Sequence, residues 1–415
     1  MKFDTYPIAG AIKKNLAAAG YKRPTDIQYK AIPSILKGED VLAVAQTGTG
    51  KTAAFAIPVV DRIHKSKGSG KKFGIQCIVM VPTRELAAQI GAVFTALARQ
   101  TRVTPLCIYG GVEQEKQIAQ LRTGVDILVA TPGRMFDLIS QGFVSVSRVN
   151  TLVLDEADRM LDQGFIKDIQ AIKKKLPRRH QTLFFSATID KEIKKLAFSQ
   201  VKTSAIRIQI SPDDPVSKNV THWMMKMTMD DKRFYLRRFV RDHEHARIMV
   251  FVRTKVRAER VAKALERSSI PCMTIHGDKD QVQRNQVMAG FKAGEDKILI
   301  ATDVSARGID IPDLDYVINY DLPEDPENYV HRVGRTGRGT RKGQAFSFCS
   351  PEEETLLAKI QALLKKPIHL VPISLKMHAQ IHVDPKDTAG LRDMILAEEA
   401  AGEKRKKSRK KSKKG

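Results

Sequence analysis

The sequence predicts two tandem α/β domains, each built on a doubly wound parallel sheet. Three observations support this fold class: short apolar runs alternate with helical stretches, the alternation breaks once at 211–218, and it then begins again. The 415 residues are too many for one ordinary domain and suit two, and the 42% of hydrophobic residues can fill two cores.

The first domain is expected over residues 1–208. Its buried parallel strands show as short apolar runs that end in small or polar residues. Between them lie helical stretches such as 84–99, whose apolar residues recur at helical spacing. The strands are expected at 41–45, 75–81, 127–130, 151–154 and 182–185.

A linker is expected over 209–218, because the segment SPDDPVSK holds two prolines and paired aspartates that suit neither a helix nor a central strand. The second domain should span 219–372. A C-terminal extension, 373–415, follows, and its Lys-rich end has too few apolar residues to repay the entropy of ordering, so we expect a disordered tail. The strands of the second domain are expected at 248–252, 273–275, 298–301, 317–320 and 345–349.

The net charge of +25 points to a polyanionic partner. Residues 403–415 carry nine Lys or Arg against one Glu, which is +8 and leaves 25 − 8 = +17 on the rest of the chain. An excess that persists without the tail favours nucleic acid or an anionic surface. The tail itself can tether RNA, target the protein or be only a solvated end.

No run approaches the ~20 apolar residues of a membrane span, and the first 20 residues lack the apolar block of a signal peptide. We therefore expect a cytoplasmic protein without membrane association. The four cysteines lie far apart without metal-ligand spacing, as in a reducing compartment. Nothing in the sequence indicates an oligomer, so a monomer is expected.

A nucleotide-binding loop is predicted directly after the run 41–45. The segment AQTGTGKT ends in the pattern of a phosphate-binding loop, although Ala45 replaces its first glycine. An ordinary Gly-rich turn is the alternative, but a strand before the loop and a helix after it favour ATP binding. Lys51 would reach the β- and γ-phosphates, and Thr52 would offer a hydroxyl to Mg²⁺. The ATP-binding residues are Gln46, Thr47, Gly48, Thr49, Gly50, Lys51 and Thr52.

An acidic pair follows the run 151–154, at the edge where open α/β sheets bind ligands. Asp155 would hold Mg²⁺, and Glu156 would orient and activate the attacking water. The alternative, a solvated acidic turn, is disfavoured by the hydrophobic strand before the pair and the GKT segment upstream.

Three arginines lie among glycines in YVHRVGRTGRG, at 329–339. Hydrolysis needs positive charge on the γ-phosphate in the transition state, and an arginine finger from a second domain supplies it only when the domains close. Arg335 and Arg338 are the catalytic candidates, with Arg332 beside them. A basic surface turn is the alternative for any one of them.

Together these motifs resemble a DEAD-box ATP-dependent RNA helicase of superfamily 2, and the short N-terminus is similar to the bacterial RhlE-like group. DEAD stands at 155–158 and HRVGRTGR at 331–338, in the order that the family shows. The resemblance implies tandem RecA-like domains, with ATP and Mg²⁺ as cofactors and RNA as partner. Further matches are PTRELA at 82–87, Gly110 with Gly111, TPGR at 131–134, SAT at 186–188, HGD at 276–278 and ATDVSARGID at 301–310.

The resemblance also implies an adenine-reading motif at GYKRPTDIQ, 20–28. A glutamine amide donates and accepts at once, so Gln28 would match the adenine edge, while Tyr21 would stack on the base. Phe3, at the family's upstream distance, and Tyr21 can equally be core aromatics. Asp310 would contact the ribose of ATP.

RNA-backbone contacts are implied at small, hydroxyl and basic residues in both domains, which position a strand without reading its sequence. Four other residues would couple hydrolysis to strand separation between the domains: Asp158, Ser186, Thr188 and His331. The implied RNA-binding residues are Thr83, Arg84, Gly111, Thr131, Arg134, Arg253, Gly277 and Thr302.

The leading hypothesis is an RNA-stimulated ATPase that closes on a duplex and separates a few base pairs without running along the strand. One alternative is an ATP-gated RNA clamp that anchors other proteins with little unwinding. Another is a translocating DNA helicase, against which the DEAD tetrad and the adenine motif argue by resemblance.

Overall fold

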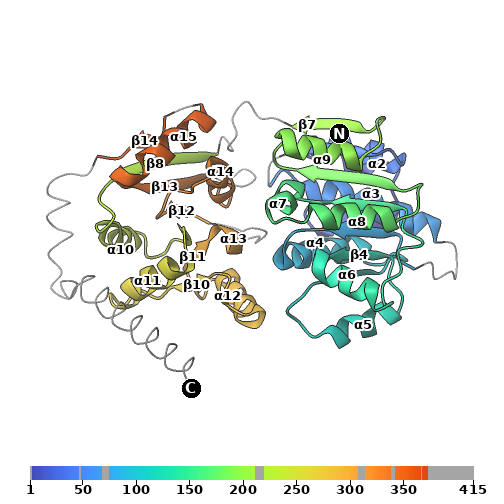
Figure 1. The fold of residues 1–415 in the computed structure, drawn as a ribbon, viewed down its shortest axis with the longest axis horizontal. Helices are drawn as coiled ribbons and strands as arrows, with labels where there is room; N and C mark the ends of the chain where they lie inside the picture. The colour runs from blue at the N-terminus through green and yellow to red at the C-terminus, as the bar shows by residue number, and fades with distance from the viewer. Residues whose placement is uncertain are drawn as a thin grey trace, which may run out of the picture.

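The chain forms two α/β lobes joined by one connection (Figure 1). The computed structural model describes residues 2–45, 48–67, 74–210, 219–306, 314–337, 342–365 and 367–372. The expected linker, apart from its first two residues, and the whole C-terminal extension lie outside the described residues. The same holds for four candidate site residues: Gln46, Thr47, Asp310 and Arg338.

The first lobe contains a seven-stranded parallel sheet in the order β3-β4-β2-β5-β6-β1-β7. The chain starts at β1 beside one edge, crosses to β2, β3 and β4 in the other half of the sheet, and returns through β5 to β6 and β7. The strands are β1 (Val41–Ala45), β2 (Cys77–Met80), β3 (Pro105–Ile108), β4 (Ile127–Ala130), β5 (Thr151–Leu154), β6 (Gln181–Ser186) and β7 (Ile206–Ile210).

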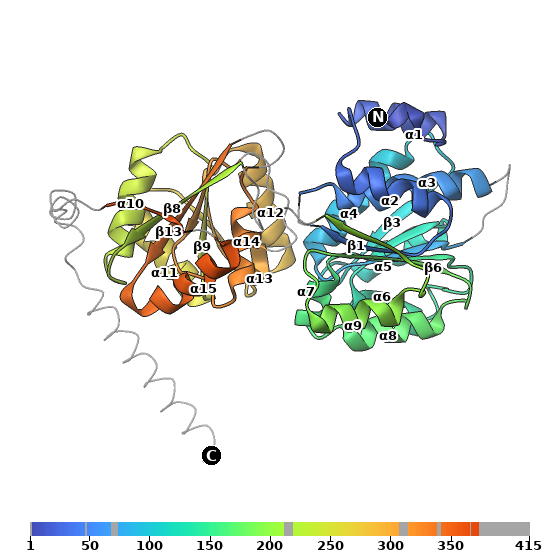
Figure 2. The same ribbon diagram turned by 90° about the horizontal axis from the view of Figure 1, so that it is seen from above.

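Helices cover both faces of this sheet (Figure 2). One apolar core lies under the first group of helices and the other under the second group. Every strand from β1 to β6 except β3 is fully buried. These strands therefore appear in the sequence as continuous apolar runs. The first group is η1 (Phe3–Thr5), α1 (Gly10–Ala18), α2 (Asp26–Leu36), α3 (Lys51–Ser66) and α4 (Arg84–Ala98). The second is α5 (Gln114–Arg122), α6 (Pro132–Ser140), α7 (Ala157–Asp162), α8 (Ile166–Lys175) and α9 (Lys191–Gln200).

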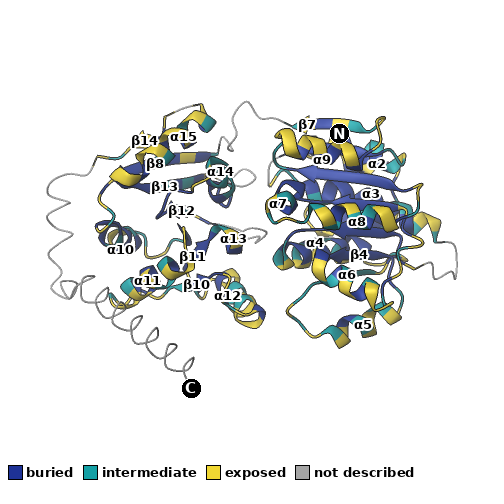
Figure 3. Ribbon diagram, viewed as in Figure 1, coloured by how far each residue is buried: buried dark blue, intermediate teal, exposed yellow. Residues whose placement is uncertain are grey.

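The second lobe repeats the plan with a parallel sheet in the order β10-β11-β9-β12-β13-β8-β14. Strand for strand this is the order of the first sheet, and in both lobes the sheet is the buried layer (Figure 3). The strands are β8 (Val220–Lys226), β9 (Ile248–Val252), β10 (Met273–Ile275), β11 (Ile298–Thr302), β12 (Tyr316–Asn319), β13 (Gly343–Cys349) and β14 (His369–Leu370).

The helices of the second lobe also divide between the two faces of its sheet. Helices α10 (Lys232–Asp242) and α11 (Lys255–Glu266) pack on one apolar cluster. The remaining helices pack on two clusters at the other face. They are α12 (Gln281–Ala293), α13 (Asp303–Ala306), α14 (Pro326–Val333), η2 (Pro351–Glu353) and α15 (Glu354–Leu364).

The predicted fold class is confirmed, and each of the ten predicted strands coincides with an observed one to within three residues at either end. Four strands were missed: β3, β7, β8 and β14. Strand β3 begins with a proline, β7 alternates apolar and charged or amide residues at a sheet edge, β8 holds polar residues, and β14 has two residues. Strand β7 also carries the first lobe to Ile210, two residues past the expected limit of 208, because Ile210 pairs with the last residue of β1.

The sheet order separates two groups of candidate residues along one edge. Strands β5, β6 and β1 are neighbours, and the ATP and coupling motifs follow them. Strands β3, β4 and β2 are neighbours too, and the first-lobe RNA candidates follow them.

In the part of the chain that the structure describes, no helix is long and apolar enough to cross a bilayer.

Candidate functional site

The loop between β1 and α3 is shaped to receive an anion. Gly48 and Gly50 have φ angles of +83° and +92°, a left-handed region that side chains other than glycine avoid. Helix α3 begins at Lys51, so the backbone amides of its first turn have no partner within the helix and point toward the loop. The Lys51 side chain is buried, and its Nζ makes no hydrogen bond to any of the residues that the structure describes. A buried ammonium without a partner is costly unless an anion such as a phosphate binds it.

The acidic pair lies next to this loop, since β5 is separated from β1 only by β6. Asp155 is buried, and burial raises its pKa to about 7; the charge of Lys51 opposes that rise, and Glu156 adds to it. A cation at this carboxylate would relieve the burial cost by holding it ionised. Asp155 and Thr52, at the start of α3, thus fit an oxygen-ligated divalent ion.

Glu156 is held in an unusual backbone conformation, with φ +54°, at the start of α7. For a residue other than glycine this costs roughly 1–2 kcal/mol, and such strain concentrates at functional sites. Its Oε2 accepts a hydrogen bond of 2.5 Å from Nη1 of the buried Arg159. Arg159 therefore positions the candidate base. This role was not predicted from the sequence, although residues three apart on a helix are close enough to form an ion pair.

The third acidic residue of the tetrad joins two strand ends. Oδ2 of Asp158 accepts hydrogen bonds from the amides of Ala187 and Thr188, at 2.9 and 3.0 Å, and from the Thr188 hydroxyl at 3.3 Å. Ser186 ends β6 and is fully buried. The contact brings together three of the four residues predicted to couple hydrolysis to strand separation.

The predicted adenine reader touches the phosphate loop. Nε2 of Gln28 donates to the carbonyl of Gly50 at 3.1 Å, and its Oε1 accepts from the amide of Thr25 at 3.0 Å. A primary amide has two donor hydrogens and two acceptor lone pairs, so one of each stays available for a base. Tyr21 is half-buried, with its ring edge-on to Phe3 at 6.2 Å between centroids. Phe3 is 5% exposed and belongs to the core, which favours the core interpretation for that residue.

The RNA candidates of the first lobe converge on the loop after β3. Arg84 lies directly on Gly111: a Cβ at that glycine would be 2.0 Å from the Arg84 Nη1. Nη2 of Arg134 donates to the carbonyl of the next residue, Val112, at 3.3 Å. Two guanidinium groups thus lie at one turn, an arrangement suited to phosphates. Thr83 and Thr131 precede these arginines as the N-caps of α4 and α6.

In the second lobe the RNA candidates lie at the carboxyl ends of β9, β10 and β11, which are also neighbours. A Cβ at Gly277 would meet no atom of the described part of the chain within 4 Å. Arg253 donates to Glu353 at 3.1 Å and to the carbonyl of Leu322 at 3.2 Å. Thr302 is buried and donates to the Ser305 hydroxyl at 3.2 Å. The last two side chains therefore have partners within their own lobe.

Comparisons with known proteins agree with this geometry. Residues 25–196 match the DEAD/DEAH box helicase family, and residues 231–340 match the helicase conserved C-terminal domain. The DEAD-box ATP-dependent RNA helicase CshA of Bacillus cereus is 39% identical over 364 residues, which are 88% of this chain and 68% of that protein. The chain belongs to the DEAD-box ATP-dependent RNA helicase family. Membership of the narrower RhlE-like group stays a prediction.

Related structures extend the likeness of this DEAD-box chain to the whole two-lobe core. Dbp5 of S. cerevisiae bound to RNA and ADP BeF3 has a TM-score of 0.81 at 31% identity, covering 89% of this chain and 95% of that one. The DEAD-box helicase Mss116 bound to ssRNA and UDP-BeF has a TM-score of 0.81 at 25% identity, covering 91% and 81%. CshA of Bacillus subtilis is 38% identical over 364 residues, covering 88% of this chain and 72% of that protein.

The arginine segment of this DEAD-box chain divides into structural and candidate catalytic residues. Arg332 is 1% exposed, pairs with Asp303 at 2.6 and 2.8 Å, and donates to the Asp321 carbonyl at 2.6 Å. These contacts hold it inside the second lobe. Arg335 is buried in the turn after α14, and its role as a finger stays a prediction.

The two lobes meet at a small acidic cavity of about 210 Å³. Asp158 and Thr188 line it from the first lobe, and Glu327 and His331 line it from the second. The pKa of Glu327 is raised to about 7, mainly by burial and then, in decreasing order, by the carboxylates Asp325, Asp158, Asp190 and Asp162. Glu327 carries no local sequence signal for this position, because only the fold places it opposite the DEAD tetrad.

A second contact between the lobes joins α4 to α12. Arg284 and Glu85 form an ion pair of 2.5 Å in which both side chains are largely buried. Beside it, Nη1 of Arg84 lies 3.4 Å from Oε1 of Gln281. An RNA candidate of the first lobe therefore touches the second lobe, so its position depends on how the two lobes are placed.

Proposed function

We propose that this chain couples ATP hydrolysis to local, non-processive unwinding or remodelling of RNA duplexes or RNA–protein complexes. The observation that carries the proposal is the shared sheet edge. The nucleotide and coupling candidates lie at the ends of β5, β6 and β1, and the first-lobe RNA candidates follow the neighbouring strands β3, β4 and β2. A movement at one half of the edge therefore reaches the other half through a single buried sheet.

In the proposed hydrolysis, the loop after β1 and Lys51 bind the phosphates of ATP. Thr52 and Asp155 would hold Mg²⁺, because this ion prefers one or two oxygen ligands together with water and substrate phosphates. When bound, the ion neutralises charge on the phosphates and orients them. Glu156, held by Arg159, orients the attacking water and accepts its proton. Arg335 and Arg338 place positive charge on the γ-phosphate when the lobes close.

The RNA strand in this proposal follows the arginines around Gly111 and continues across the second lobe to Gly277. Dbp5 and Mss116, which are similar over most of the chain, have been solved bound to RNA and to ssRNA. Backbone contacts of this kind position a strand without reading its sequence. The contact of Arg84 with Gln281 supports a track that depends on how the lobes are placed.

We place this activity in the cytoplasm and in a monomer. The four cysteines are free thiols, as expected in a reducing compartment, and burial raises the pKa of each. These two assignments and the role of each candidate residue are parts of the same proposal.

Strand displacement tests the proposal. With ATP, the protein should separate a short RNA duplex and fail on a long one, because unwinding is local. Glu156→Gln should stop displacement while leaving ATP binding intact, since the amide cannot accept a proton from water. Glu192→Gln, the same chemical change at an exposed position of α9, is the matched control. Stable ATP-dependent RNA binding without any displacement would instead support the clamp.

A further inference from the structure

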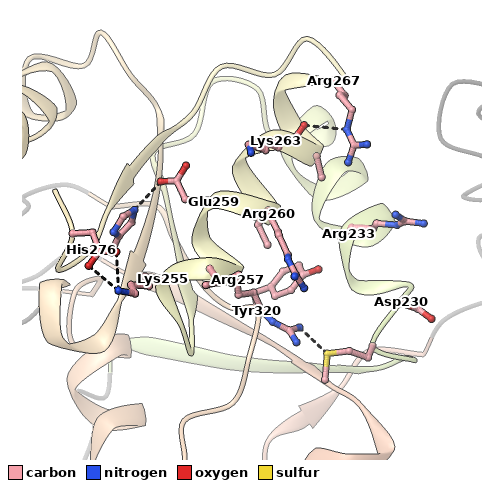
Figure 4. A pocket seen from close by; sticks show the side chains of 15 residues that line it. Asp230, Arg233, Lys255, Arg257, Glu259, Arg260, Lys263, Arg267, His276 and Tyr320 are labelled. Atoms are coloured by element: carbon pink, nitrogen blue, oxygen red, sulfur yellow. Dashed lines mark hydrogen bonds and ion pairs between the residues drawn. The ribbon is translucent and has the colours of Figure 1, made fainter. Parts of the chain in front are cut away.

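A basic groove lies on the second lobe, between helices α10 and α11. Its volume is about 360 Å³. Six basic and three acidic side chains line it, an excess of three positive charges. Figure 4 shows the basic side chains placed along α11, with Arg233 on the neighbouring helix α10. The basic residues are Arg233, Lys255, Arg257, Arg260, Lys263 and Arg267.

Two of the three acidic side chains are already matched by cations. Asp278 pairs with Lys255 at 2.7 Å, where α11 begins. Glu259 accepts a hydrogen bond from His276 at 2.7 Å and lies 3.5 Å from Lys279. Among the basic residues, Arg257 also pairs with Asp321, at 3.3 Å. Arg260, Lys263 and Arg267 come after the members of these pairs that lie on α11.

Three of the basic residues repeat at helical spacing, two of them on α11 and the third at the residue directly after it. Arg260, Lys263 and Arg267 follow at the spacing i, i+3 and i+7, and all three are exposed. Like charges at such spacing repel one another and destabilise a helix slightly. A polyanion bound along the helix would be attracted by all three cations and would offset their mutual repulsion.

The floor of the groove is apolar. Val261, Ala264 and Met229 line it, together with Tyr320 at the end of β12. Val256, at the mouth, is 50% exposed although it is a large aliphatic residue. Basic walls over an apolar floor suit a nucleic-acid strand, whose phosphates need cations while its bases and sugars need contact surface.

The groove opens where the RNA track is proposed to end. Lys255 lies two residues after Arg253, and His276 and Asp278 flank Gly277. The proposed track and the groove thus share the carboxyl ends of β9 and β10. We infer that the groove between α10 and α11 binds a further segment of single-stranded RNA, continuous with the strand in the track. This inference rests on the proposed function.

The test is the dependence of RNA affinity on strand length and salt. The variant Arg260→Gln/Lys263→Gln/Arg267→Gln removes three exposed charges from the groove. Lys167→Gln/Lys174→Gln/Lys175→Gln removes three exposed charges from α8 of the other lobe and is the matched control. Affinities are measured with an ATP analogue for oligouridines of about 4 to 16 nucleotides, the usual range of single-strand site sizes.

Wild type and the α8 control should bind more tightly as the strand lengthens, whereas the groove variant should stop gaining affinity beyond the shorter strands. Each phosphate neutralised contributes roughly 0.7 to the salt slope of single-strand binding, so for long strands the slope should be smaller by about 2 in the groove variant. The single change Lys263→Gln should lower it by about 0.7. Basal ATPase activity should be the same in all four proteins.

Equal affinity and equal salt slope of wild type and groove variant on the long strands would overturn the inference. The groove would then serve another polyanion, such as an acidic protein segment, or none. Failure of wild type to bind even the short strands would instead defeat the proposed RNA track, and with it this extension. The two failures are therefore distinguishable in one titration.

Discussion

Replacing Gly111 by alanine should weaken RNA binding by displacing an arginine rather than by removing one. The φ angle of +79° is strained for alanine by roughly 1–2 kcal/mol. The new Cβ would lie 2.0 Å from Nη1 of Arg84 and 2.7 Å from its Cζ. Because the guanidinium is the mobile end of a long side chain, the arginine moves and the fold survives. Its contact with Gln281 of the second lobe is then lost.

The loss can be estimated from one charge-assisted hydrogen bond to a phosphate. Such a bond contributes about 1.5–3 kcal/mol, which corresponds to a roughly 10- to 150-fold change in affinity. The RNA concentration for half-maximal ATPase activity should therefore rise by about that factor, while ATP affinity without RNA stays unchanged. Titrating ATPase activity with single-stranded RNA measures the effect.

Two further variants separate displacement from backbone strain. Gly142→Ala introduces the same strain, since φ is +80°, but its Cβ meets no atom within 4 Å. Both glycine variants should lose similar free energy of unfolding, and only Gly111→Ala should lose RNA affinity. In an Arg84→Ala background, Gly111→Ala should cost no further RNA affinity, because the displaced group is absent. Additive losses of RNA affinity would refute the reasoning.

Three more predictions concern the nucleotide and the lobe interface. Gln28→Ala should relax the preference for ATP over GTP, measured as the ratio of kcat/KM values; an unchanged ratio would argue against base reading. Arg335→Ala should lower kcat with a much smaller change in ATP affinity, because a finger acts in the transition state, whereas a loss seen wholly as weaker ATP binding would contradict that role. For Glu327, the pKa of about 7 exceeds the ordinary 4.5, so its contribution to stability is present at pH 4 and lost as pH rises through 7. Glu327→Gln should therefore raise the unfolding temperature at pH 8 and match wild type at pH 4; a lower unfolding temperature at pH 8 would show that the carboxylate stabilises the interface.

The interior of the fold was predictable because buried parallel strands are uniform apolar runs. Strands β1 and β9, with five buried residues each, were predicted with their observed bounds. The edge strand β7 was not, since only Ile208 in it is buried and its pattern resembles a surface loop. Strand β8 holds Thr221 and His222 within the sheet, where pairing with Gln344 and Ala345 of β13 outweighs local preference.

The candidate site was predictable where a motif is local and unpredictable where the fold brings distant residues together. The placement of Lys51 after a strand follows from adjacent residues. The pairing of Glu85 with Arg284 joins residues about 200 positions apart, and no local pattern contains it. The same holds for Glu327 beside the DEAD tetrad and for the basic groove, whose walls come from two helices.

The ATPase rate with and without single-stranded RNA tests the central claim most directly, because it depends on the nucleotide site, the RNA track and their coupling. Single-stranded RNA should raise the rate of wild type well above its basal value, and DNA of the same sequence should raise it far less. Lys51→Ala should nearly abolish hydrolysis in both conditions, because the buried ammonium no longer binds the β- and γ-phosphates. A rate that is independent of RNA, or that survives the loss of Lys51, would contradict the account.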